Sequence, residues 1–219
     1  NFVVVPADLC SFSGLERLRD KHPDRLYNVG IAEQNMIGVA AGMAKEGMNV
    51  FCSTYAAFAS ARCLDQVKVN MAYMRQPVRL VGLTSGYAVG ILGATHMCLE
   101  DLAVLRALPD ITVLSPADGL GTVKLVLAAA LHPGPVYIRL GGGMNSPVVY
   151  SKDTSFEIGK ANVLREGSDV VIFSTGPMVW AALQAAERIG RSGTACRVID
   201  VHTIKPLDLE AVRQALKKF

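Results

Sequence analysis

Glu33 is the residue whose type and position most directly suggest chemistry. It comes just before a stretch of small apolar residues, Met36–Gly42, which predicts a helix packed closely against its surroundings. The simpler interpretation is a carboxylate that complements the positive end of the helix dipole, worth up to about 1 kcal/mol. The alternative is a functional carboxylate, because a charge at the start of such a helix lies next to a buried surface.

Five other positions carry side chains that could form a site. Tyr55 and Phe58 are three residues apart, and two such aromatic residues commonly fill a core. His96 lies in a loop, and a lone histidine is more often a hydrogen-bonding residue than a catalyst. Arg139 ends an apolar run, so its charge needs a partner, most simply an internal salt bridge. Asp8 follows the first apolar run and could cap a turn or helix.

Apolar runs rich in β-branched residues alternate with helical periodicity along the first two thirds of the chain. Runs that are apolar throughout predict strands buried on both faces, as in a parallel sheet covered by helices. The fold class expected is α/β, with a doubly wound, mostly parallel sheet, in which ligands bind beyond the carboxyl ends of strands. The predicted strands are Phe2–Val5, Val50–Thr54, Val78–Leu83, Ile111–Leu114 and Val136–Leu140. The predicted helices are Ser13–Lys21, Glu33–Glu46, Ala56–Met71, Glu100–Leu108 and Gly119–Leu131.

The sequence changes character after Arg139. Three glycines, Gly141–Gly143, and the segment Met144–Ser155 indicate a linker. We therefore expect a domain at 1–150 and part of a second α/β domain at 151–219, too short to be complete. Its expected elements are Asp169–Ser174, Met178–Ile189, Ala195–Val201 and Asp208–Lys218.

Composition excludes several classes of function. The chain has 219 residues, of which 51% are hydrophobic and 19% charged, with a formal charge of +3. Its basic residues are scattered and no apolar run could span a membrane, so neither a nucleic acid nor a membrane is expected as partner. The five cysteines are far apart and do not cluster with the four histidines. We interpret them as reduced thiols of a cytoplasmic protein and expect no metal site in this chain.

Several motifs, in order along nearly the whole chain, point to one family. Residues 27–35 read Y-N-V-G-I-A-E-Q-N and precede the Gly/Ala-rich helix. The other matching segments are Ser53–Ser60, Gly93–His96 with Glu100-Asp101, Leu108–Val113, Ser115–Asp118, Gly134–Arg139 and Thr203–Asp208. The ordered set resembles transketolases, 1-deoxyxylulose-5-phosphate synthases and related split enzymes.

The resemblance implies a role for each candidate residue. Glu33 would hydrogen-bond N1′ of the aminopyrimidine of thiamine diphosphate and help the cofactor lose its C2 proton. Tyr55 and Phe58 would form the wall around the aminopyrimidine, and Asp8 would lie near the cofactor. His96 would face a substrate hydroxyl or carbonyl oxygen and pass protons.

Arg139 would contact the phosphate of a sugar substrate under the same resemblance. The chain nevertheless departs from the family at a third aromatic position, which is Ala61. Three further positions where sugar-phosphate transketolases carry polar groups are Thr84, Leu92 and Phe12. These departures predict a looser wall, or one completed by a partner, and a substrate less polar than an ordinary ketose phosphate.

The half of the family that binds the diphosphate is missing from the chain, which has no G-D-G…N segment for Mg²⁺. We therefore expect a diphosphate-binding subunit or domain as partner, Mg²⁺ bound there, and a dimer of such pairs. The function predicted is transfer of a two-carbon ketol or related acyl unit between small carbonyl substrates. Alternatives are the β subunit of a 2-oxo acid dehydrogenase, a non-catalytic scaffold subunit of the same fold, and a plain nucleotide-binding sheet, which the absence of G-x-G-x-x-G disfavours.

Overall fold

The computed structural model describes residues 2–143 and 146–218, which form two compact units. The first contains the chain up to Val113 and Ala129–Gly141, and the second contains Leu114–Ala128 and the chain from Gly142 on. Residues 144 and 145 of the predicted linker lie outside the described residues. The domain boundary predicted near Ser151 is a different division from these two compact units, and it stays a prediction.

The first unit is built on a parallel sheet whose strand order is β1-β2-β3-β5-β4. Hydrogen-bonded parallel pairs join β1 to β2, β2 to β3 and β3 to β5. Val50, Leu80 and Ile138 are fully buried, as the continuous apolar runs predicted. The strands are β1 (Phe2–Pro6), β2 (Asn49–Tyr55), β3 (Val78–Leu83), β4 (Thr112–Leu114) and β5 (Val136–Arg139).

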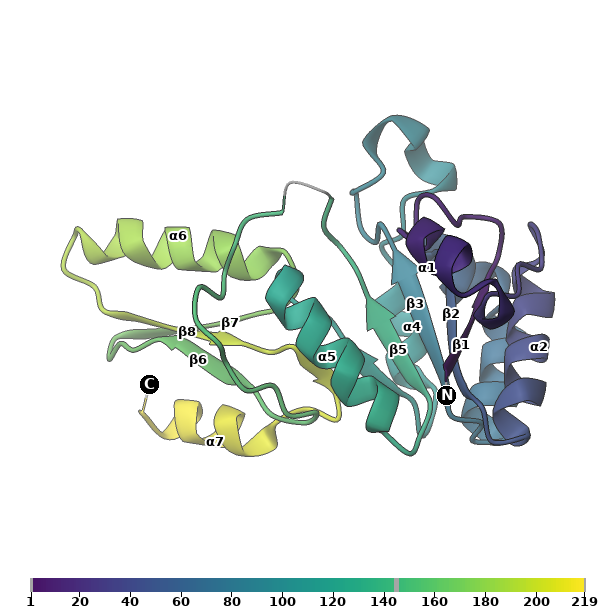
Figure 1. Ribbon diagram of the computed structural model, residues 1–219. Coiled ribbons are helices and arrows are strands. Elements are labelled where there is room, and N and C mark those ends of the chain that lie inside the picture. The colour runs from purple at the N-terminus through teal and green to yellow at the C-terminus, as the bar shows by residue number, and fades with distance from the viewer. Residues whose placement is uncertain (1, 144–145, 219) are drawn as a thin grey trace. The chain divides into compact units, whose positions relative to one another are not determined.

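Helices cover this sheet. Met36, Ile37 and Ala40 of α2 are completely buried, and α2 packs beside β1 and β2 (Figure 1). The sequence predicted one helix over Ala56–Met71; the structure instead has two π-helical segments, Phe58–Arg62 and Val67–Tyr73, around a short α-helical turn. The α-helices of this unit are α1 (Glu16–Lys21), α2 (Glu33–Lys45), α3 (Leu64–Gln66) and α4 (Asp101–Ala107), with 3₁₀ turns at Pro23–Arg25 and Gly90–Thr95. Helix α5 (Gly119–Leu131) belongs largely to the second unit.

The second unit has a three-stranded sheet of order β6-β8-β7, in which β7 (Val170–Ser174) runs parallel and β6 (Asn162–Arg165) antiparallel to β8 (Cys196–Asp200). Helices α6 (Met178–Gly190) and α7 (Leu209–Lys218) cover its opposite faces (Figure 1). The predicted strands and helices of this unit are confirmed to within two residues at each end. The sequence missed β6 and the short β9 (Thr203–Lys205).

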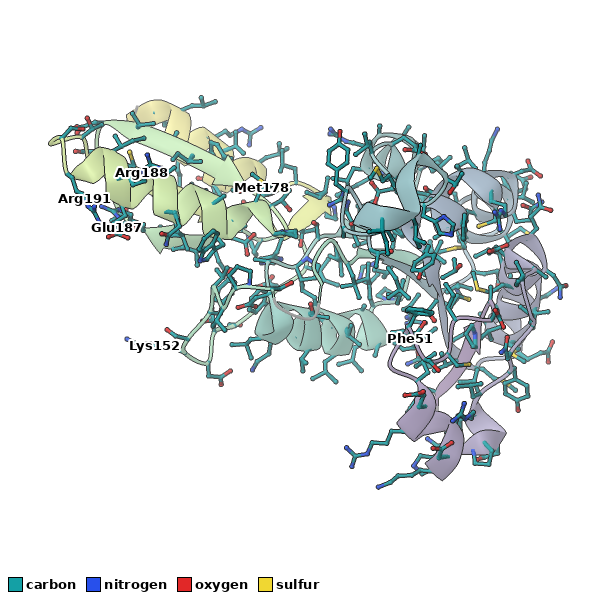
Figure 2. The ribbon with its side chains drawn as sticks, turned by 90° about the horizontal axis from the view of Figure 1, so that it is seen from above. Phe51, Lys152, Met178, Glu187, Arg188 and Arg191 are labelled. Carbon is teal, nitrogen blue, oxygen red and sulfur yellow. The ribbon has the colours of Figure 1, made fainter. Side chains whose placement is uncertain are left out.

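Alternation along β8 explains how both helices are held. Val198 packs against Ala182 and Ala186 of α6, whereas Ile199 packs against Ala215 of α7. Figure 2 shows Met178 at one end of α6 and Glu187, Arg188 and Arg191 toward the other, where Arg191 and Glu187 form an exposed ion pair. No helix among the described residues is long and apolar enough to cross a membrane.

A buried chain of polar contacts organises the second unit. Asp118, just before α5, accepts hydrogen bonds from the backbone N–H groups of Gly121, Val149 and Tyr150. The Tyr150 hydroxyl in turn donates to Asp200 Oδ2 at 2.6 Å. Burial raises the pKa of Asp200 to about 7, and Asp118 adds to this rise while the Tyr150 hydrogen bond opposes it.

Replacing Asp200 by Asn should stabilise the protein at neutral and alkaline pH. Because the folded-state pKa of Asp200 lies above its ordinary value of 3.8, the stabilisation from its protonated form is complete below pH 4 and is lost as the pH rises toward 7. The asparagine side chain stays neutral at every pH, so we expect a gain in unfolding free energy of roughly 2–4 kcal/mol at pH 8 and little at pH 4.

Denaturant unfolding of the wild type and Asp200→Asn at a series of pH values measures this difference. Burial lowers the pKa of His202 to about 4, but both proteins carry His202, so comparison at equal pH isolates residue 200. The exposed Asp153, paired with Lys124, is the control, and Asp153→Asn should show no such pH dependence. An equal effect of Asp200→Asn at pH 4 and pH 8 would contradict the prediction.

Candidate active site

The carboxyl ends of β1, β2 and β3 lie at one edge of the first unit's sheet. The register places Pro6 opposite Ser53, and Tyr55 opposite Leu83. At these ends, the buried side-chain oxygens of Thr54, near the end of β2, and of Thr84 and Ser85, just after β3, have no hydrogen-bond partner among the described residues. Because buried polar atoms are normally paired, this edge of the sheet is short of partners where a ligand is expected.

Glu33 is the first residue of α2 and only 3% of it is exposed. The residue before it, Ala32, supplies no side-chain cap, and the turn into the helix is made by Gly30, which has a positive φ of 72°. A carboxylate that only complemented the helix dipole could remain in water. Its burial means that Glu33 needs a specific partner.

That partner is Arg62, a residue that the sequence interpretation missed. Its Nη1 donates to both Glu33 oxygens at 2.9 Å, and its guanidinium carbon lies 3.8 Å from the centre of the Phe58 ring. The Gln34 side chain donates to the Arg62 carbonyl at 3.3 Å. Arg62 follows Phe58 by four residues, a spacing that places helical side chains together and was the one available signal.

Three of the predicted site residues form a ring cluster next to this ion pair. The ring centres of Tyr55 and Phe58 are 5.9 Å apart, and His96 lies 5.5 Å from Tyr55 and 5.2 Å from Phe58 in edge-on contacts. Thr95 Oγ1 lies 2.8 Å from His96 Nδ1. The structure thus joins the predicted aromatic wall, His96 and, through Arg62, Glu33.

Asp8 lies close to the same edge, but its side chain makes no hydrogen bond to any described residue. It is exposed, with a positive φ of 66°. Asn28 Oδ1 accepts hydrogen bonds from the N–H groups of Asp8 and Gly30, at 3.0 and 2.9 Å. Asn28 therefore ties the loop after β1 to the turn that begins α2.

Arg139 is engaged inside the first unit. Its Nε donates to Asp101 Oδ2 at 2.9 Å, and the Tyr137 hydroxyl donates to the same oxygen at 2.9 Å. Asp101 is completely buried and Arg139 is 15% exposed. The internal salt bridge is therefore present, while Nη2 of Arg139 lies beside the Gly86 loop and makes no hydrogen bond recorded in the described chain. The Tyr137 ring packs over Gly82, where any side chain would collide with it.

The substrate-facing positions singled out by the sequence lie around this edge. Phe12 is 77% exposed and its ring centre is 6.4 Å from that of Tyr55. Leu92 is also exposed, whereas Thr84 adopts a positive φ of 51° with its hydroxyl buried. Leu92 and Phe12 thus present apolar surface on loops.

The thiols near the site are kept neutral. Burial raises the pKa of Cys63 to about 12, and the negative charge of Glu33 contributes to this rise. All five cysteines are buried and unpaired. Among the described residues, no three His, Cys, Asp or Glu side chains are grouped so that they could hold a metal ion.

Comparisons with known proteins agree with the fold and with the motifs. Residues 1–144 match the family "Transketolase, pyrimidine binding domain" and residues 159–219 match "Transketolase, C-terminal domain". The chain is 43% identical to the 6-deoxy-6-sulfo-D-fructose transketolase subunit SqwH of Clostridium sp. (strain MSTE9), over 98% of the chain and 67% of that relative. It is 41% identical to an apulose-4-phosphate transketolase subunit of Phocaeicola vulgatus, over 100% of the chain and 70% of that relative.

A solved split gene transketolase, described as an inactive β4 tetramer, superimposes with a TM-score of 0.91 at 39% identity, over 99% of this chain and 70% of that one. The fold and the site edge thus define an α/β protein with a pyrimidine-binding domain of the thiamine diphosphate enzymes. The chain belongs to the transketolase family. It is a thiamine diphosphate-dependent, transketolase-like transferase subunit that acts with a partner subunit, and the dehydrogenase and scaffold alternatives are not favoured.

Removing the carboxylate of Asp101 should strongly destabilise the first unit. Asp101→Ala leaves the nearly buried Arg139 charge without its partner, and breaking such a pair costs about 3–5 kcal/mol. Tyr137→Phe removes one hydrogen bond but keeps the ion pair, so we expect about 1 kcal/mol. Urea unfolding of the two variants measures both; a loss below about 1 kcal/mol in Asp101→Ala would show that the pair does not hold the fold together.

Proposed function

We propose that the edge formed by Glu33, Tyr55 and Phe58 binds the aminopyrimidine of thiamine diphosphate. The observation that carries this proposal is the buried Glu33 carboxylate held beside the Phe58 ring, with a flat cation, the Arg62 guanidinium, in contact with both. A protonated aminopyrimidine is also flat and also presents an N–H group, so the residues present fit the cofactor. The unpartnered hydroxyls of Thr54, Thr84 and Ser85 are further support for a ligand here.

The chain's own residues have distinct tasks in this proposal. Thiamine diphosphate, when bound, supplies a nucleophilic carbon and an electron sink for carbonyl chemistry. Glu33 accepts a hydrogen bond from the pyrimidine and holds the proton shared there, which its burial makes effective. Tyr55 and Phe58 provide the flat contact and exclude water. His96 exchanges protons with a substrate oxygen, and Asp8 lines the cofactor side of the loop after β1.

The remaining parts of the site belong to the partner in this proposal. The sequence carries no diphosphate-binding segment, so we assign Mg²⁺ and the diphosphate to a separate subunit or domain. The β4 assembly of the solved split gene relative is described as inactive, which supports a requirement for such a partner. We propose a heteromer, a dimer of such pairs, placed in the cytoplasm because all five thiols are unpaired. The division into domains at 1–150 and 151–219 is part of the same proposal.

We propose a substrate that has an anionic end but fewer hydroxyl groups in need of hydrogen-bond partners than an ordinary ketose phosphate has. One similar protein is named for a sulfonated ketose and another for apulose 4-phosphate, so anionic, unusual sugars occur among relatives. Arg139 is the candidate for the anionic end through its terminal nitrogens, since only Nε is bound to Asp101. The exposed apolar side chains of Leu92 and Phe12 offer no hydrogen bonds to sugar hydroxyls.

Glu33→Gln tests the cofactor site directly. Glutamine keeps the size of the side chain but cannot share a proton in the same way, so exchange of the cofactor's C2 proton should slow by about 10²-fold or more. The measurement is deuterium exchange at C2 of thiamine diphosphate bound to the complete heteromer. Glu46→Gln, at the exposed end of the same helix, is the matched control and should leave the rate unchanged. An unchanged rate in Glu33→Gln would return Glu33 to a structural role.

Substrate choice can be tested on the same complex. Desolvating a hydroxyl without a partner costs about 1–3 kcal/mol, so we expect low kcat/KM for xylulose 5-phosphate with ribose 5-phosphate. Ketoses that carry a sulfonate or phosphate but fewer or rearranged hydroxyls should be at least tenfold better. Efficient turnover of the standard pair would refute this substrate preference and leave the cofactor site untouched, because the partner could then supply the missing polar groups.

A further inference from the structure

Arg62 makes two contacts that a bound aminopyrimidine would also need. Its Nη1 lies 2.9 Å from both Glu33 oxygens, so one nitrogen approaches the carboxylate end-on instead of two nitrogens forming a fork. The guanidinium carbon lies over the Phe58 ring, 3.8 Å from its centre. One donor nitrogen directed at Glu33 from a flat cationic group beside Phe58 is also what a protonated aminopyrimidine would present in the proposed site.

The burial of Glu33 explains why some cation must be there. An ionised carboxylate of which only 3% is exposed to water is costly without a counter-charge, and the cofactor is not always bound. Among the described residues, Arg62 is the one cation within ion-pair distance of Glu33. It therefore keeps the carboxylate paired and in place while the pyrimidine is absent.

The Arg62 side chain is also placed so that it can move away from Glu33. Its side chain is 44% exposed and contacts Glu33 through one nitrogen. The guanidinium can therefore leave Glu33 and become fully hydrated. Its backbone stays anchored, because the Gln34 side chain bonds the Arg62 carbonyl. The π-helical turn Phe58–Arg62 carries both the aromatic platform and the cation, and such turns are frequent at functional sites.

We propose that Arg62 is a stand-in for the aminopyrimidine: it occupies the Glu33–Phe58 site in the cofactor-free subunit and is displaced when thiamine diphosphate binds. This inference rests on the proposed cofactor site. It implies that competition with Arg62 lowers the affinity of that site for thiamine diphosphate. Any ligand that needs both contacts competes with the guanidinium, so the apparent affinity is reduced by the fraction of molecules in which Arg62 has moved away.

The test compares Arg62→Ala with wild type in the full-length protein assembled with its partner subunit. Arg62→Ala should lower the melting temperature of the cofactor-free complex by several degrees but change that of the cofactor-bound complex little. The gain in melting temperature on adding thiamine diphosphate and Mg²⁺ should therefore be larger than in wild type. By calorimetry, the Kd for thiamine diphosphate should fall about three- to thirtyfold. Arg62→Lys keeps the charge but not the flat group, and should give an intermediate Kd.

Arg75→Ala is the matched control, because Arg75 makes an exposed ion pair with Asp110 at 3.0 Å and should leave both readouts unchanged. A higher or unchanged Kd in Arg62→Ala would overturn the stand-in, since a residue that only positions Glu33 in the bound state must weaken binding when removed. C2 exchange in Glu33→Gln separates the two proposals. Slowed exchange with weaker binding in Arg62→Ala overturns the stand-in alone, whereas unchanged exchange overturns both.

Discussion

The ion pair between Glu33 and Arg62 is the constraint from which the rest of the site follows. The proposed role of Glu33 at a pyrimidine requires a carboxylate in a dry place, and a buried ionised carboxylate needs a counter-charge or several hydrogen bonds. The fold provides the dry place by starting α2 against the sheet edge, with Gly30 turning the chain and Asn28 tying two loops together. It provides the counter-charge from Arg62, four residues beyond the Phe58 ring. The Glu33 side chain thus depends on local backbone geometry, on packing and on electrostatics together.

The same rule governs the other buried charges, with different solutions. Asp101 is paired with Arg139 and Tyr137 inside the first unit. Arg79 has no carboxylate partner among the described residues and donates instead to backbone carbonyls, including those of Ala129 and His132, where α5 ends; the carbonyl end of a helix favours a cation. The Asp101 and Arg79 arrangements lock their groups in place. The Glu33 pair differs because the Arg62 side chain is 44% exposed, against 15% for Arg139, so it is better suited to exchange partners.

Much of the fold could be predicted from the sequence because its strands are largely buried, and continuous apolar runs such as Phe2–Val5 have few other interpretations. The antiparallel strand Asn162–Arg165 was missed because it is short and partly exposed, so its pattern resembles a loop. The π-helical winding of Phe58–Arg62 leaves no signal in residue types. Glu33 could be found from its motif, whereas Arg62 had only its spacing of four residues from Phe58 as a signal. A motif shows order along the chain, but the partner of a buried charge is decided by contact through space.

The two parts of the proposed site depend differently on the fold. Glu33, Tyr55 and Phe58 lie on α2, the end of β2 and the π-helical turn that follows it, elements fixed by the core of the first unit. Phe12 and Leu92 lie on exposed loops, where replacement disturbs little of the fold. Relatives that match this chain at 41% and 43% identity along nearly all its length are named for different ketoses. In the proposed site, the exposed loop positions are therefore the ones at which replacement would alter substrate contacts with little cost to the fold.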